Sequence, residues 1–141
     1  MTRRDLVLAA MAPANGGRFT PVQIQKLFFL IDQNVAGHVD GPHFSFGPYH
    51  YGPFDKAVYH EIDGLVSQGL AEHVQDRRWT SYRLTELGQL RGEQIARELA
   101  PQAQDYIKRA VDFVRRLSFT DLVSAIYRAY PEMRENSVFQ G

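Results

Sequence analysis

The sequence LAEHVQDRRWTSYRLT, at residues 70–85, is the segment of this chain that most clearly indicates its architecture. Apolar, aromatic and β-branched residues are interleaved with polar ones over residues 70–74 and again over residues 79–84, as in half-buried strands. Between these runs lie four polar residues, Gln75 to Arg78, which suit a turn. The stretch therefore predicts a two-stranded β-hairpin.

Three helices are predicted before this hairpin. The first covers residues 3–11 with Thr2 as its cap, and the second begins at Pro21 after the capping hydroxyl of Thr20. The second helix is apolar on nearly every side through its middle, so we expect it to be central and buried. The third is expected to begin at Pro53, with Phe54, Val58, Ile62 and Leu65 as its apolar face, and to end near Gly69.

Residues 37–53 have no helical or strand periodicity and contain three Gly-Pro pairs. Each proline removes a backbone donor and restricts the residue before it. This pattern predicts an ordered irregular loop, with a short extended piece over residues 43–46.

Further helices are predicted after the hairpin. Thr85 caps the first, whose apolar stripe is expected to be Leu87, Leu90, Ile95 and Leu99. A second follows Pro101, and a third is capped by Ser118 and closed by Pro131. The last ten residues are mostly polar, and we expect them on the surface or in contact with a partner.

Three helices followed by a hairpin is the order of a winged helix-turn-helix domain. The predicted fold class is therefore mainly α (α+β), a winged helix with a two-stranded wing and a C-terminal helical layer. We expect a winged-helix-like unit over residues 1–90, helices over residues 91–130 packed on it within the same domain, and a tail over residues 131–141.

Composition excludes several classes of protein. The chain has 141 residues, 44% hydrophobic and 23% charged, which is typical of one globular domain. It has no cysteine, and its sixteen basic side chains balance sixteen acidic ones. We expect a cytoplasmic protein with no disulfide framework, no thiol nucleophile, no membrane partner and no general attraction to nucleic acid.

Two stretches resemble a known family. The first combines KLFFLID at residues 26–32, YHYGPF at residues 49–54 and IDGLVSQGL at residues 62–70, and the second is YRLTELG at residues 82–88. The first resembles the Panacea family of SocA-like antitoxin domains and the similar YwgA-like proteins, and the second resembles the wing exit of many winged-helix proteins. The resemblance covers about residues 1–90. It implies a non-enzymatic module that neutralises a toxin or acts as an adaptor through direct protein contact, and it brings no catalytic residues.

No reactive constellation is visible in the sequence. The five histidines are scattered, and His60 is not followed by a second histidine one turn later, as a metalloprotease helix would require. His38, Asp40 and His43 could gather in one loop, although solvated loop histidines are the simpler interpretation. We therefore predict no enzyme, no catalytic residue, no cofactor and no metal.

The aromatic loop over residues 43–54 is the most distinctive feature of the sequence. Aromatic side chains on a proline-stiffened backbone offer contact area at small entropic cost, which suits a protein-binding surface. The alternative is that these rings only hold the loop over the second helix. Phe44 and Phe54 are the expected core members, and Tyr49, His50 and Tyr51 the candidate partner-binding residues.

DNA binding by a transcriptional regulator is the alternative function. Its candidate residues are Lys56 and His60 in the third helix and Arg77, Arg78, Trp79 and Arg83 in the wing. Acidic residues on the same helix oppose it, and residues 1–84 contain eight basic and eight acidic side chains. An ordinary charged turn, with Trp79 covering the edge of the core, is the simpler interpretation of the wing.

The predicted partner is a protein, with a toxin as one candidate. A homodimer through Tyr106, Phe113 and Tyr130 is also open at this stage. The charged residues of the C-terminal helices alternate in sign and are expected to form a solvated face.

Overall fold

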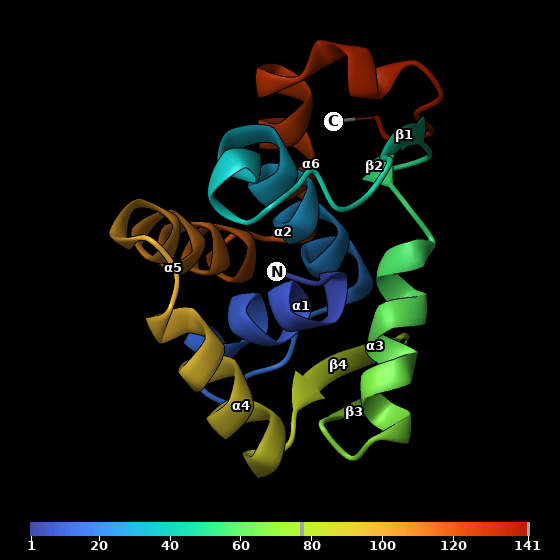
Figure 1. Cartoon of the computed structure of the whole chain (residues 1–141). Helices are drawn as coiled ribbons and strands as arrows, with labels where there is room; N and C mark the ends of the chain where they lie inside the picture. Colours follow the sequence, from blue (N-terminus) through green and yellow to red (C-terminus); the bar gives the residue numbers. More distant parts are fainter. Residues whose placement is uncertain (77, 141) are drawn as a thin grey trace.

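The computed structural model describes residues 1–76 and 78–140, and it shows a mainly helical α/β fold with small antiparallel two-stranded sheets (Figure 1). Helices α1 and α2 occupy the centre, α3 and the β3–β4 hairpin lie on one side, α4 and α5 on the other, and α6 above them. The elements are α1 (Arg3–Met11), α2 (Pro21–Asn34), β1 (Gly47–Tyr49), β2 (Gly52–Phe54), α3 (Ala57–Ser67), β3 (Ala71–Gln75), β4 (Thr80–Leu84), α4 (Glu86–Arg97), α5 (Pro101–Arg116) and α6 (Phe119–Ala129), with short 3-10 turns η1 (Ala12–Ala14), η2 (Ala36–His38) and η3 (Pro131–Arg134).

The first two helices begin where the sequence predicts. The Asp5 backbone N–H donates to Thr2 Oγ1 at 3.1 Å, which satisfies one of the free donors at the start of α1. At the start of α2, Gln23 N–H donates to Thr20 Oγ1 at 3.3 Å and Thr20 N–H donates to Gln23 Oε1 at 2.9 Å. This reciprocal pair is a capping box. Both helices are buried around their whole circumference, over residues 6–11 and 24–32.

The predicted β3–β4 hairpin is confirmed. Its strands pair antiparallel from Ala71 opposite Leu84 to Gln75 opposite Thr80, and Trp79 lies just before β4. An isolated bridge joins Phe19 to Tyr82 outside the hairpin, with N–H to carbonyl distances of 2.8 and 2.9 Å. The segment that leads into α2 is therefore attached to the edge of β4.

The aromatic loop contains a second hairpin that the sequence did not predict. Strand β1 pairs with β2, with Gly47 opposite Phe54 and Tyr49 opposite Gly52. Gly52 has φ +102°, a conformation that side chains with a Cβ rarely adopt. Pairing begins only at Gly47, so residues 43–46, where a short extended piece was expected, belong to no strand.

The start predicted for the third helix was also wrong. Pro53 and Phe54 belong to β2, and α3 begins at Ala57. The reason is local, because the Asp55 carboxylate accepts the Ala57 N–H at 2.9 Å and so satisfies a free donor of the first turn. The later face, which includes Val58, Ile62 and Leu65, is buried as expected.

Only the C-terminal half of the stripe predicted for α4 is buried: Leu99 lies in the core and Ile95 packs partly buried against it. Leu87 and Leu90 are 48% and 58% exposed. Gly88 and Gly92 are buried instead, where a Cβ would come within 1.8 Å of the backbone oxygen of the residue before β3 and within 2.4 Å of a backbone oxygen of α1. Close backbone contact, not leucine packing, therefore places the first turns of α4.

The C-terminal helices pack on the N-terminal part of the chain. Helix α5 contacts α2, and α6 is capped by Ser118, whose Oγ accepts the Asp121 N–H at 3.1 Å. The tail folds back onto the β1–β2 turn, where Val138 N–H donates to the His50 carbonyl at 3.0 Å. Within residues 1–76 and 78–140, no helix combines the length and apolar character that a bilayer crossing requires.

Candidate functional site

Buried polar side chains of α2 hold the aromatic loop in place. The Asp32 carboxylate accepts the backbone N–H groups of His43 and Phe44, each at 2.9 Å. Gln25 accepts the Asp55 N–H at 2.9 Å and donates to the Asp55 carbonyl at 3.0 Å. The loop backbone thus finds partners on a helix that precedes it, and α2 has no solvated polar face over residues 24–32.

Lys26 is the third buried polar residue of α2. It is 3% exposed, and its Nζ donates to the Pro53 carbonyl at 3.4 Å. Burial away from water lowers the pKa of Lys26 from its ordinary value to about 7. A Cβ on Gly52 would lie 3.5 Å from Lys26 Cε, so the hairpin backbone rests on the end of the lysine side chain.

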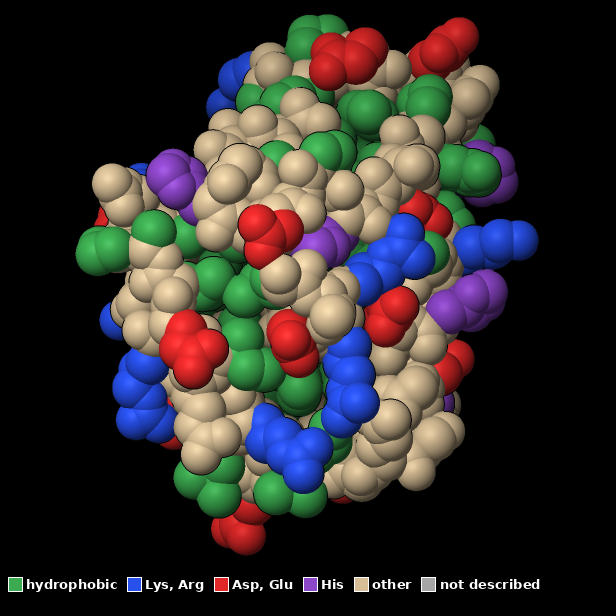
Figure 2. Space-filling view, in the orientation of Figure 1, with side chains coloured by type: hydrophobic (Ala, Val, Ile, Leu, Met, Phe, Trp, Pro, Cys, Tyr) green, Lys and Arg blue, Asp and Glu red, His purple; other side chains and the backbone are tan. Residues whose placement is uncertain are grey.

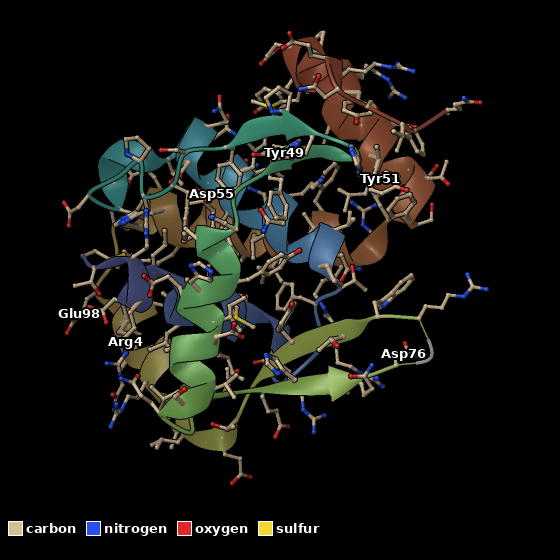
Figure 3. The ribbon with its side chains drawn as sticks, turned by 90° about the vertical axis from the view of Figure 1, so that its right-hand side faces the viewer. Arg4, Tyr49, Tyr51, Asp55, Asp76 and Glu98 are labelled. Carbon is tan, nitrogen blue, oxygen red and sulfur yellow. The ribbon has the colours of Figure 1, made fainter. Side chains whose placement is uncertain are left out.

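A groove of about 890 Å³ opens above Lys26. It lies between the β1–β2 hairpin, the β3–β4 hairpin and the first turns of α2 and α6. Figure 3 shows the two hairpins from this side, with Tyr49 and Tyr51 on one and Asp76 near the tip of the other. The groove is lined by Thr20, Pro21, Val22, Gln23, Gln25, Lys26, Tyr49, His50, Tyr51, Gly52, Phe54, Tyr59, Arg78, Trp79, Leu117, Ser118, Phe119 and Leu122.

One row of aromatic rings runs from the first hairpin to the second. Ring centroids of Tyr49 and Phe54 are 5.1 Å apart, those of Phe54 and Tyr59 are 5.7 Å apart, and Tyr59 stacks on Tyr82 at 5.7 Å. Burial raises the pKa of Tyr59 to about 12, so its hydroxyl stays protonated at neutral pH. This row links α3 to both hairpins.

A second row links the β1–β2 turn to α6 and the tail. Tyr51 meets Phe119 at 5.2 Å between ring centroids, and Phe139 lies 6.1 Å from Phe119 and 6.2 Å from Tyr127. Such edge-on and tilted pairs are favourable at these distances. The C-terminal tail thereby supports the aromatic side chains at this end of the groove.

The predicted partner-binding residues all lie on the groove. Tyr49, His50 and Tyr51 are exposed, with the two tyrosines 54% and 43% exposed. Phe44 is in the core as expected, but Phe54 belongs to β2, is only half-buried and lines the groove. Their role in binding stays a prediction.

The wing residues proposed for DNA are divided by the structure. Arg78 and Trp79 line the groove, and Trp79 is 41% exposed, so it does not cover the core edge. Arg83 forms an ion pair with Glu72 across the β3–β4 hairpin. Arg77 lies outside the described residues.

Helix α3 presents both signs of charge. Lys56 and His60 are exposed one turn apart, outside the groove lining. Asp63, about one turn further along, contacts His73 Nε2 at 3.0 Å. Figure 2 shows basic and acidic side chains interspersed over the face of the molecule that it displays. Neither this face nor α3 carries a continuous basic surface.

The residues proposed for a dimer contact their own chain. The Asn34 amide donates to the Tyr106 hydroxyl at 2.8 Å and to the Tyr130 hydroxyl at 3.2 Å. Phe113 is half-buried and packs against the core. A homodimer through these three side chains stays untested.

Sequence reasoning missed the roles of Gln25, Lys26 and Asp32. The sequence does contain a signal for these roles. A helix that is apolar on every side leaves no solvated face, so its polar side chains must find hydrogen-bond partners inside the protein. In the part of the chain that the structure describes, no group of three or more histidine, aspartate or glutamate side chains is placed to hold a metal ion.

No protein-family model matches the chain, and no curated protein or solved structure matches it either. The resemblance to the Panacea family therefore stays a prediction, carried by the residues quoted for it.

Proposed function

We propose that this chain is a non-enzymatic protein-interaction module that binds a segment of a partner protein in the groove. One observation carries this proposal. Of the large hydrophobic side chains that are exposed among the described residues, Tyr49, Tyr51, Trp79 and Phe119 border the groove, at 41 to 54% exposure. Exposed apolar side chains gathered in this way are typical of an interaction site, and aromatic residues contribute strongly to binding.

The proposed partner is a toxin, which makes the chain an antitoxin. The resemblance to SocA-like antitoxins supports this proposal, because the residues that carry it include Lys26 and the segment 49–54, which form part of the groove. A winged-helix assignment is supported by the order of α1, α2, α3 and the β3–β4 hairpin, and by the bridge from Phe19 to that hairpin.

Co-expression with the product of the adjacent gene tests this function. We expect the chain to restore growth when that product is toxic, and to co-purify with it. The double variant Tyr51→Ala and Phe119→Ala, which removes two facing rings of the groove, should lose both effects. Leu90→Ala is the control because Leu90 is also an exposed large hydrophobic residue but lies on α4, outside the groove lining. Equal rescue by both variants would exclude the groove as the binding site.

DNA binding is the second candidate function. The exposed Lys56, just before α3, and His60, on α3, favour it, since they could face the major groove, while Arg78 at the wing could contact phosphates. A salt titration of duplex DNA binding separates the two functions. A steep salt dependence that is reduced by Arg78→Gln supports the regulator, and weak or absent binding opposes it.

A further inference from the structure

The groove is basic as well as apolar. Among its described lining residues are Lys26, His50 and Arg78 but no aspartate or glutamate, although the chain contains sixteen acidic residues. The first turns of α2 and α6 also border the groove, and the start of a helix carries a partial positive charge. The lining is therefore complementary in charge to an anionic ligand.

Lys26 lacks a partner that matches its charge. An ammonium group has three donors, and the Pro53 carbonyl at 3.4 Å is a long contact for one of them. No carboxylate in the described part of the chain forms an ion pair with Lys26. Because a buried charge is costly without a paired and hydrogen-bonded partner, a carboxylate that entered the groove would gain a strong interaction here.

We infer that the groove binds an acidic, apolar segment of a partner polypeptide, with one carboxylate of that segment hydrogen-bonded to Lys26 Nζ between the two aromatic rows. This inference rests on the proposed function, because it specifies the chemistry of the segment that the module would bind. The aromatic rings that line the same groove as Lys26 would accept the apolar side chains that flank the carboxylate.

The placement of charge favours a polypeptide over a single-stranded nucleic acid. A nucleic acid strand carries one phosphate per nucleotide, and proteins that bind it place cations along the path of its backbone. The described lining of the groove contains one lysine and one arginine: Lys26 is buried at the floor of the groove, and Arg78 is exposed at its edge. One focused positive site suits one carboxylate.

Peptide selection tests the inference. A library of fully randomised hexapeptides is selected against the immobilised full-length chain, and the preferred peptide is then synthesised with its acidic residue and with the corresponding amide. Binding is followed by the fluorescence of Trp79, which is the only tryptophan of the chain and lines the groove. We expect the selected peptides to carry an acidic residue between aromatic or aliphatic ones, and the amide version to bind at least about tenfold more weakly.

Variants assign the preference to Lys26. In Lys26→Gln the acid and amide peptides should bind within about twofold of each other, whereas Lys56→Gln, an exposed control outside the lining, should keep the full preference. Arg78→Gln changes an exposed residue at the edge of the groove, so this variant should fold normally. It should weaken the binding of each peptide by a smaller factor than that by which Lys26→Gln weakens binding of the acidic peptide.

Three results would overturn the inference. The first is equal binding of the acid and amide peptides by the unmodified chain, and the second is a selection that yields peptides without acidic residues or no peptides at all. The third is tighter binding of a ten-nucleotide oligodeoxythymidine than of the selected peptide. The proposed function would survive each of these if the Tyr51 and Phe119 variant still lost its protein partner. If that variant kept its partner, the proposed function would fail, whatever the peptide experiments show.

Discussion

The two hairpins of this molecule are built in different ways. Strands β3 and β4 are five residues long, follow an alternating sequence and pair through a regular ladder from residue 71 to residue 84. Strands β1 and β2 are three residues long and each contains a proline. Their flanking segments are held by buried side chains of α2, and their turn by the C-terminal tail. One hairpin follows from its own sequence, whereas the other depends on distant residues.

This difference determines which side chains each hairpin can expose to solvent or to a partner. A hairpin that depends on its own strand pairs can accept exposed charges, and β3–β4 carries the Glu72–Arg83 pair on its surface. A hairpin held from beneath by Gln25, Lys26 and Asp32 can turn aromatic side chains outward instead of using them as core. The groove forms where these two kinds of hairpin face each other.

The largest effect is expected where the β3–β4 hairpin meets the helical core. Gly88→Ala should destabilise the fold by about 3 kcal/mol, because the new Cβ would lie 1.8 Å from the backbone oxygen of Leu70. Urea unfolding measures the change. Gly64→Ala is the control, since nothing lies within 4 Å of its Cβ position in α3, and it should stabilise the chain by about 0.5 to 1 kcal/mol. Equal effects of the two substitutions would show that the close approach of α4 to the Leu70 backbone does not limit stability.

The dependence of the β1–β2 hairpin on α2 is tested by Asp32→Ala. Loss of the carboxylate leaves two backbone donors, at His43 and Phe44, without their partner, and should cost about 2 to 3 kcal/mol. Amide hydrogen exchange should accelerate at Phe44 and stay unchanged at Tyr82 in the other hairpin. Asp112→Ala removes an exposed pair and should change stability by less than about 0.5 kcal/mol.

Lys26 makes stability depend on pH. Its pKa is about 7 in the folded chain and near 10.5 when unfolded, so above pH 7 the unfolded chain binds more protons. Stability should therefore rise with pH between these values, by about 2 kcal/mol from pH 7 to pH 9. Urea unfolding at both pH values should show that Lys26→Met removes this rise and Lys56→Met retains it. The same rise in both variants would assign it to another group.

The smallest effect is expected at the surface of the β3–β4 hairpin. Arg83→Ala breaks the exposed pair with Glu72 and should change the free energy of unfolding by less than about 0.5 kcal/mol, measured by urea unfolding. A cost above 1 kcal/mol would show that this hairpin, too, depends on more than its backbone ladder and its tertiary contacts.

Much of the fold could be predicted from the sequence because its signals are local. The caps at Thr2, Thr20, Thr85 and Ser118 each act on a backbone group within three residues. The position of α4 could not be predicted in full from leucine spacing. Its first turns are buried through Gly88 and Gly92, and this burial depends on how closely the backbones of Leu70 and α1 approach.

The candidate site could be predicted only in part. Exposed aromatics at Tyr49 and Tyr51 followed from the proline-rich loop, but the contribution of Trp79 to the same groove did not. Lys26 was visible as a polar residue in an apolar helix, yet nothing adjacent to it in sequence shows that its Nζ meets the Pro53 carbonyl.

The helix starts that follow a capping side chain, the β3–β4 hairpin and the balance of charge can all be read from the sequence, since each depends on composition or on interactions between near neighbours. The groove that α2, both hairpins and α6 surround, with a buried lysine at its floor, exists only in the folded chain. The physical reason is distance along the chain: these groups meet through contacts such as Tyr51 with Phe119, which no local periodicity encodes.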